Sequence, residues 1–223
     1  LPSDGVLSEQ LKISRPSKLI FVSKMQARGL LTSKASAGVF VTGVLGSAFS
    51  EPLIQLFANH DEAVFDYLSF RRDMEGLAAE RAAIHGTDSD LAVIAAVFTK
   101  MEAAHVKRNP SEEAGLDAEF HLAIIEASHN VIMLHMMRSM YQLLREGVFY
   151  NRQVMFKQRT TRASLLDQHR AINDALQARD AAGARAAVEA HLDYVEAALT
   201  ADRTMEKNEA IARQRLRRET DRR

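Results

Sequence analysis

The chain has 223 residues, of which 47% are hydrophobic and 26% are charged, and its formal net charge at neutral pH is zero. This composition is too apolar for a disordered chain and supports one large domain or two small ones. Because cysteine is absent, disulfides and thiolate metal sites are excluded, and any metal must bind through histidine and carboxylate. No apolar run approaches the roughly 20 residues of a membrane-spanning helix, and no secretory signal is visible, so we expect a cytoplasmic protein without membrane contact.

The zero net charge conceals basic segments at both ends of the chain. Residues 1–42 carry six lysines and arginines against two acids, and residues 203–223 carry eight against four. A basic module on an acidic body is typical of a nucleic-acid-binding unit joined to a sensing or assembly domain. The basic residues after 202 also have a simpler interpretation as a solvated tail.

The first 42 residues are predicted to form a winged helix-turn-helix from two helices and two short strands, at 5–11, 15–28, 30–32 and 39–42. Ser14 is a candidate N-cap for the second helix, Pro16 fits its first turn, and Gly29 is placed to end it. Small residues dominate 43–50, which we interpret as a linker to a second domain.

The next part of the chain, residues 51–202, is predicted to be an all-α domain with no convincing strand. Its helical periodicity and its breaks indicate six or seven helices, at 51–58, 61–85, 88–107, 111–128, 130–157, 160–178 and 180–202. The predicted fold class is therefore mainly α, with a winged helix-turn-helix ahead of a helical bundle and a basic tail over 203–223.

Four polar residues interrupt the apolar faces of three of these helices: Asp117, His121, His169 and His191. Asp117 and His121 are four residues apart, so a helix points both side chains in the same direction. A polar ring that faces a core must find a partner there or carry a desolvation cost. Each histidine alone could be an ordinary hydrogen-bonded core residue. Three imidazoles and one carboxylate together, however, suit a divalent transition metal such as zinc, nickel or manganese, and they predict a metal site in this domain.

Several longer motifs are similar to those of one known family. In the N-terminal part they are Leu7-Ser8-Glu9-Gln10-Leu11, Ser14-Arg15-Pro16-Ser17 and Gly29-Leu30-Leu31. In the C-terminal part they are Phe70-Arg71-Arg72-Asp73-Met74-Glu75, Asp117-Ala118-Glu119-Phe120-His121, Glu126-Ala127-Ser128-His129-Asn130, His169-Arg170-Ala171-Ile172 and Ala190-His191-Leu192. Over essentially its whole length the chain resembles GntR-superfamily transcriptional regulators of the FadR subfamily, which carry a C-terminal ligand-binding FCD domain.

This resemblance implies a homodimeric repressor that binds operator DNA and is controlled by a small molecule. In metal-binding members of the family, the residues matching the four predicted ligands hold a divalent cation. The sequence of residues 43–85 is most similar to that of members that respond to lactate, glycolate or pyruvate.

The resemblance also implies an effector site beside the metal. Arg71 matches an arginine that would bind the effector carboxylate, and Asn130 and Arg152 are weaker candidates for the pocket. Two open positions on an octahedral ion would suit a 2-hydroxy or 2-oxo acid, and Arg71 would add a charge-assisted hydrogen bond. The alternative for Arg71 is an ion pair with Glu75 on a helix surface, since the two residues are four apart.

The DNA-binding half departs from the family pattern. Recognition helices of the family usually continue with Val-Arg-Glu-Ala-Leu, where this chain has Lys18-Leu19-Ile20-Phe21-Val22. We also expect the first helix of such a domain to lie outside this chain. The candidate DNA contacts are Arg15, Ser17, Lys18 and Lys34.

Two alternatives follow from the residues. A helical metalloenzyme is suggested by Glu102–His105 and Glu126–His129, which have the Glu-x-x-His spacing of di-iron bundles. Against it, Glu126 points away from the apolar stripe of its helix, and no general base is evident beside the predicted metal. The second alternative is a metabolite-binding dimer whose DNA-binding module has decayed, as the apolar run at residues 19–21 would allow. We expect a regulator and not an enzyme.

Overall fold

The computed structural model describes residues 14–28, 30–34, 38–41, 62–145 and 159–220, together with residues 12, 54, 57 and 60. The chain divides into two compact units, Leu1–Phe49 and Ser50–Arg223. Within the described segments, no helix combines the length and the apolar character that crossing a membrane requires.

The described part of the first unit contains one helix and two strands, α2 (Arg15–Ala27), β1 (Leu31–Lys34) and β2 (Gly38–Val41). The strands pair antiparallel with Leu31 opposite Val41, as a hairpin requires. Ser14 caps α2 as predicted, because its Oγ accepts a hydrogen bond from the Ser17 amide at 3.3 Å. The helix expected at 5–11 lies outside the described residues.

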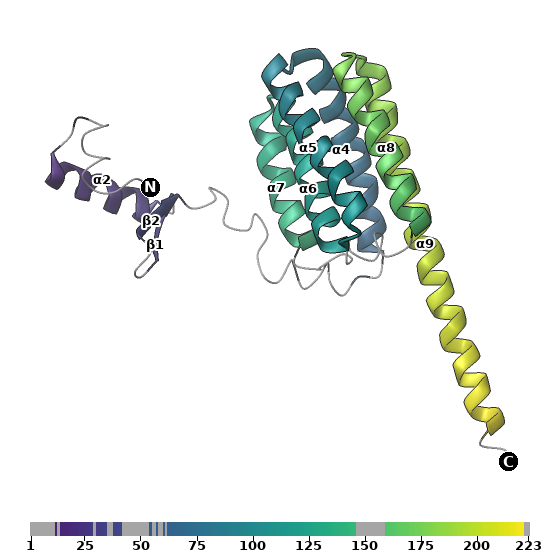
Figure 1. Cartoon of the computed structure of the whole chain (residues 1–223). Coiled ribbons are helices and arrows are strands. Elements are labelled where there is room, and N and C mark those ends of the chain that lie inside the picture. The colour runs from purple at the N-terminus through teal and green to yellow at the C-terminus, as the bar shows by residue number, and fades with distance from the viewer. Residues whose placement is uncertain are drawn as a thin grey trace. The chain divides into compact units, whose positions relative to one another are not determined.

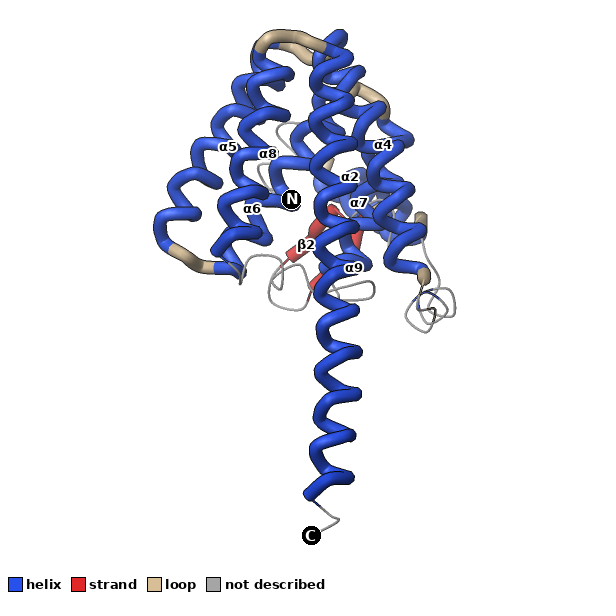
Figure 2. The backbone as a smooth tube through the Cα atoms, turned by 90° about the vertical axis from the view of Figure 1, so that its right-hand side faces the viewer, coloured by secondary structure: helices blue, strands red, loops and turns tan. Residues whose placement is uncertain are grey.

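The described part of the second unit consists of helices and the short turns between them, without a strand, which confirms the predicted mainly-α fold. Its helices are α4 (Ala63–His85), α5 (Asp88–Lys107), α6 (Pro110–Ala127), α7 (Val131–Arg145), α8 (Arg159–Gln177) and α9 (Ala181–Thr220). Figures 1 and 2 show them side by side as a bundle. Of the helix expected at 51–58 only residues 54 and 57 are described, and the helix expected at 130–157 is described as far as residue 145.

Local signals explain where two of these helices begin. Thr87 and Asp90 form a capping box at the start of α5, in which each side chain accepts a hydrogen bond from the other residue's backbone amide. At the start of α6, Asn109 Oδ1 accepts hydrogen bonds from the backbone amides of Ser111 and Glu112, and Pro110 occupies the first turn. The turns predicted at these positions are therefore built from side chains close by in the sequence.

The core of the bundle lies between α4, α5, α6, α8 and α9. Ala78, Ala79 and Ala82 of α4 are completely buried, and such small side chains let neighbouring helices approach closely. Ala79 and Ala82 belong to the largest core cluster, which also contains Ile94, Phe98, Phe120, Ile124, Ile172, Leu176, Val188 and Leu192. This apolar packing surrounds the polar residues described below, so it fixes their positions.

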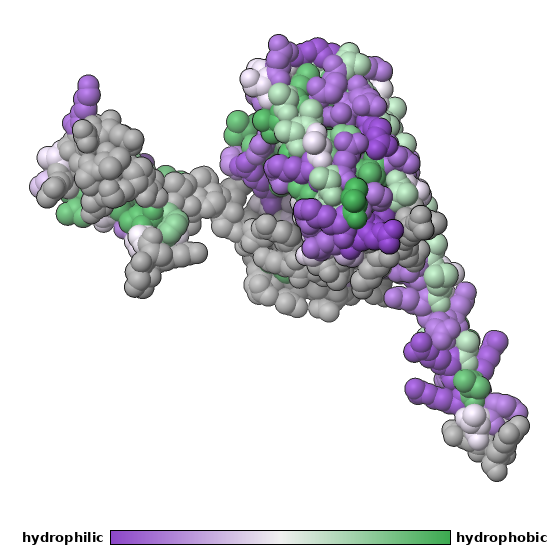
Figure 3. All heavy atoms as spheres, in the orientation of Figure 1, coloured by the Kyte–Doolittle hydropathy of each residue, from purple (hydrophilic) through white to green (hydrophobic). Residues whose placement is uncertain are grey.

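Helix α9 is longer than expected. We predicted that it would end near residue 202, followed by a basic tail, but it continues without a break to Thr220. Residues 204–220 are exposed, and Figure 3 shows this part of α9 as mostly hydrophilic with a few hydrophobic residues spaced along it. The residues of this stretch are good helix formers, and α9 already supplies the nucleated helix on which they extend.

Candidate metal centre

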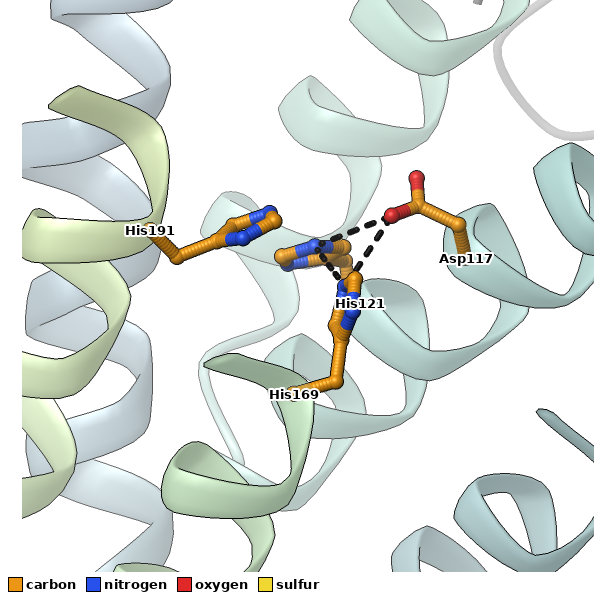
Figure 4. Close-up of side chains that lie close together, drawn as sticks. All are labelled: Asp117, His121, His169 and His191. Atoms are coloured by element: carbon orange, nitrogen blue, oxygen red, sulfur yellow. Dashed lines mark hydrogen bonds and ion pairs between the residues drawn. The ribbon is translucent and has the colours of Figure 1, made fainter. Parts of the chain in front are cut away.

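The structure brings the four predicted ligands together inside the helical unit. Asp117 and His121 come from α6, His169 from α8 and His191 from α9 (Figure 4). All four are buried, and one ligand atom of each lies within 4.8 Å of the others. In the part of the chain that the structure describes, no other group of three or more histidines, aspartates or glutamates converges in this way.

Short distances define the centre of this cluster. Asp117 Oδ1 lies 3.0 Å from His169 Nε2 and 3.8 Å from His121 Nε2, and these two Nε2 atoms are 3.3 Å apart. The ring of Phe120 stands edge-on to both imidazoles, with centroid separations of 6.0 Å for His121 and 5.4 Å for His169. An apolar ring therefore lines the cluster, and a low-dielectric wall strengthens the electrostatic interactions within it.

The outer nitrogen of each imidazole also has a partner. His121 Nδ1 lies 2.8 Å from Glu75 Oε2, an ion-pair contact without the geometry of a hydrogen bond. His169 Nδ1 is hydrogen-bonded to the Leu165 carbonyl oxygen at 2.7 Å, and His191 Nδ1 to Gln168 Oε1 at 2.9 Å. An acceptor at Nδ1 favours the tautomer that carries its proton there, which leaves the Nε2 lone pair bare. Three imidazoles beside one carboxylate form a donor set that fits a divalent metal.

Burial also favours the neutral imidazoles that a metal requires. Desolvation lowers the pKa of His121 below its ordinary value, although Glu75 and Asp117 oppose this shift. Desolvation lowers the pKa of His191 well below its ordinary value, and its histidine neighbours lower it further. Metals bind the unprotonated imidazole, so the lowered pKa values favour the form of these side chains that binds a metal.

A buried network on the α4 side supports His121. Arg71 donates from Nε to Glu75 Oε1 at 2.6 Å and from Nη2 to Tyr141 Oη at 2.9 Å, and Tyr141 donates in turn to Glu75 Oε1 at 2.8 Å. Burial by itself raises the pKa of Glu75, but Arg71 and His121 lower it more, so the carboxylate is ionised. The ion pair between residues 71 and 75 that we considered does form, but it is buried beside a predicted ligand and not on the helix surface.

Sequence reasoning missed Glu75 as a member of this site. The signal was available, because Leu68, Arg71, Glu75 and Ala79 follow one another at helical spacing on the buried face of α4. We treated Glu75 only as a possible surface partner of Arg71. A carboxylate on the apolar stripe of a helix should itself have indicated a buried partner.

The other two predicted effector residues are Asn130 and Arg152. Asn130 is half-buried, and its Oδ1 accepts a hydrogen bond from the Met133 amide at 3.0 Å, which caps the start of α7. Arg152 lies outside the described residues.

The candidate DNA contacts lie in the first unit. Ser17 is exposed on α2, whereas Lys18 is buried at 3% exposure, so Lys18 would have to turn outward to reach DNA. Arg15 begins α2 and Lys34 ends β1, and the structure does not describe their side chains.

The chain is also similar in sequence to a known domain family and to several bacterial regulators. The FCD domain family matches residues 66–194. The chain is 35% identical over 200 residues to the putative L-lactate dehydrogenase operon regulatory protein of Escherichia coli strain K12. The aligned region covers 87% of this chain and 76% of that protein. It is 30% identical to the HTH-type transcriptional regulator LutR of Bacillus subtilis strain 168, over 90% of this chain and 91% of LutR. It is also 30% identical to the Glc operon transcriptional activator of Escherichia coli strain K12, over 80% of this chain and 72% of that protein.

Solved structures share the same fold. Streptococcus agalactiae GntR superposes with a TM-score of 0.57 at 21% identity, over 87% of each chain. E. coli McbR/YncC superposes with a TM-score of 0.53 at 18% identity, over 89% of this chain and 86% of that chain.

A helical FCD domain that follows a helix and a hairpin in the sequence is typical of a class of bacterial transcriptional regulators. The chain belongs to the GntR family of transcriptional regulators, in the group with an FCD domain. The named relatives are regulators of operons or of transcription, which confirms our expectation of a regulator. The Glu-x-x-His pairs of the enzyme alternative agree with this, since Glu102 pairs with Arg170 and Glu126 with Arg138 on the surface.

Proposed function

We propose that this regulator senses a small 2-hydroxy or 2-oxo acid at a divalent metal held by Asp117, His121, His169 and His191. The observation that carries this proposal is the convergence of one nitrogen from each of three imidazoles and one carboxylate in a buried site, with each Nδ1 next to an oxygen. When bound, zinc, nickel or manganese would supply open coordination positions for the carboxylate and the neighbouring oxygen of the acid.

The names of two relatives support this class of effector. One refers to an L-lactate dehydrogenase operon and another to the Glc operon. A site that combines a hard carboxylate and imidazoles with a nearby guanidinium suits a small anionic acid.

Arg71 is the proposed partner of the effector carboxylate. Its guanidinium is 1% exposed and already binds Glu75 and Tyr141, so an acid that reaches it competes with or adds to this network. Glu75 of α4 contacts His121 of α6 and Tyr141 of α7, so a change in this network on effector binding would alter contacts between all three helices. Arg152 remains a pocket candidate, as does Asn130 if it leaves the α7 cap.

In this proposal the protein acts as a cytoplasmic homodimer that binds operator DNA as a repressor. Two copies of α2 would enter half-sites about one helical turn apart, with contacts from Arg15, Ser17 and Lys34, and from Lys18 once its side chain turns outward. Effector binding would alter the affinity by favouring one arrangement of the two copies.

A thermal-shift panel of small carboxylates, run on metal-loaded and chelated protein, tests the sensor. A ligand at 100 times its Kd adds about 2.7 kcal/mol, which raises the unfolding temperature by several degrees for a chain of this size. We expect a shift that requires both the metal and one 2-hydroxy or 2-oxo acid, and that Arg71→Lys reduces. If no acid shifts the metal-loaded protein, the metal is structural and the carboxylate-sensor proposal is wrong.

The alternative of a metabolite-binding dimer with a decayed DNA module is tested separately. Full-length protein is mixed with random-sequence duplexes, and bound DNA is amplified and sequenced over several rounds. Enrichment of one motif supports the regulator. An acid-dependent thermal shift without any enriched motif supports the decayed module.

A further inference from the structure

The outward face of α2 is apolar where a DNA-reading helix commonly carries hydrogen-bonding side chains. Leu19 is 63% exposed, Ile20 59% and Phe21 43%. Exposed serines stand on either side of this run, Ser17 before it and Ser23 after it. The structure thus presents aliphatic and aromatic side chains in the middle of the helix.

Helical spacing shows which of these side chains points directly away from the hairpin. The inner face is formed by Lys18, Val22, Met25 and Gln26, which are buried or half-buried, and Gln26 Nε2 donates to Ser33 Oγ of β1 at 2.6 Å. Ile20 lies about 160° around the helix from Lys18 at 100° per residue, so it occupies the centre of the outer face.

The charge of this helix indicates what covers the face. α2 contains three basic residues and no acidic one, in a stretch of six cations against two acids over residues 1–42. Such an imbalance attracts a polyanion, and the chain belongs to a family of transcriptional regulators. Double-stranded DNA is therefore the occupant that matches both the charge and the family.

We propose that Ile20 reads the C5-methyl group of thymine in the major groove. An alkyl side chain can neither donate nor accept a hydrogen bond, and the thymine methyl is the apolar group that base edges present in that groove. This inference rests on the proposed DNA binding of α2. It adds that the central base contact is a methyl contact and not the arginine–guanine pairing that is commonest in such complexes.

The test uses full-length protein and the duplex motif enriched from random DNA. Each thymine of the motif is replaced in turn by deoxyuridine, which removes the methyl group and keeps O4 and base pairing. Burial of one CH₂-sized group contributes about 0.8 kcal/mol, so wild-type affinity should fall about fourfold per methyl at the thymines that α2 reads. Ile20→Ala should bind the thymine and deoxyuridine duplexes equally well.

Ile84→Ala is the matched control, because Ile84 is 55% exposed on α4 in the other unit. It should keep the fourfold preference of the wild type. The inference is overturned, while DNA binding stands, if the wild type does not distinguish deoxyuridine at any position or if Ile20→Ala retains the preference. Failure of the full chain to enrich any duplex overturns the inference and the DNA-binding part of the proposed function together.

Discussion

Glu75 connects the predicted metal centre to α4, a helix that supplies none of the four ligands. Its Oε2 lies 2.8 Å from His121 Nδ1, and Arg71 and Tyr141 hold the same carboxylate from the other side. A carboxylate behind a metal-binding histidine fixes the tautomer and the ring orientation and makes the imidazole a stronger base. At the scale of single residues, the site therefore depends on more than the four side chains that would touch the metal.

Replacing Glu75 should weaken metal binding even though this residue is not a ligand. We expect Glu75→Gln to lower metal affinity about 10- to 100-fold, because His121 loses its charged partner. Competition with a coloured chelator measures the affinity. Glu80→Gln is the control, because Glu80 lies on the same helix but pairs with Arg185 at a partly exposed position. Equal affinities for the Glu75 variant and the wild type would show that Glu75 does not position His121.

At the scale of elements, the start of α5 depends on a charged capping box. The Thr87 amide and hydroxyl both donate to Asp90 Oδ2, at 2.8 and 2.6 Å. The hydrogen bonds from Thr87 lower the pKa of the Asp90 carboxyl below its ordinary value. A carboxyl with a lowered pKa in the folded state stabilises the fold above its unfolded-state pKa, and this stabilisation is lost as the pH falls through the folded value.

The effect of Asp90→Ala on stability should therefore depend on pH. At pH 7 we expect the substitution to cost about 1 kcal/mol, as for other helix caps. As the pH falls below about 4 and then through the lowered folded-state pKa, the wild-type carboxyl becomes protonated first in the unfolded and then in the folded state, so the difference should shrink. Urea unfolding of metal-free protein at the two pH values measures it. Asp73→Ala, at an exposed position within α4, is the control, and a cost for Asp90→Ala that stays constant down to pH 3 would contradict the prediction.

Three helices meet at a buried ion pair at the other end of α5. Arg162 of α8 donates from Nε to Glu113 Oε2 at 2.9 Å and from Nη2 to Glu113 Oε1 at 2.6 Å, and Nη2 also donates to the carbonyl oxygen of His105 at 2.7 Å. The side chains of Arg162 and Glu113 are 8% and 6% exposed. Removal of one member leaves the other as an uncompensated buried charge.

Arg162→Met should destabilise the bundle by about 3–5 kcal/mol, because Glu113 then remains charged and buried. The double variant Arg162→Met/Glu113→Leu should recover most of this loss, since both charges are removed together. Denaturant midpoints of the three proteins measure the difference. Arg170→Met is the exposed control on α8 and should cost less than about 1 kcal/mol. Failure of the double variant to recover would assign the loss to packing and not to charge.

At the scale of the whole molecule, the predicted metal would join helices that are distant in the sequence. Its ligands come from α6, α8 and α9, and these helices share the main core cluster. A ligand that binds the folded state and not the unfolded chain stabilises the entire cooperative unit. Metal binding should therefore be visible as global stability, independently of DNA.

Adding zinc, nickel or manganese at 100 times the Kd should raise the stability of the bundle by about 2.7 kcal/mol. His191→Ala should lose most of this increase, because α9 then supplies no ligand, and a chelator should abolish the increase in the wild type. His129→Ala, at an exposed position, should behave as the wild type does. Calorimetry with and without metal measures these differences, and an undiminished increase in the His191 variant would exclude it as a ligand.

Much of the fold could be predicted because its signals are local. The capping residues Ser14 and Asn109 act on amides two or three positions away, and apolar periodicity identifies the buried face of each helix. The end of α9 was misplaced, because basic composition alone does not distinguish a helix from an unstructured tail. Glu75 was missed because we considered its neighbour on the same helix and not its partner on another.

The sequence alone determined the residue types of the site and their placement on apolar helical faces. Spacing within one helix, as for Asp117 and His121, follows directly from 3.6 residues per turn. Only the tertiary structure decided that His169 and His191 meet these two residues and that Arg71 is buried. It also decided that Tyr141, 70 residues beyond Arg71 in the chain, binds the Glu75 carboxylate together with Arg71. Contacts between helices depend on how the complete core packs, which no local segment encodes.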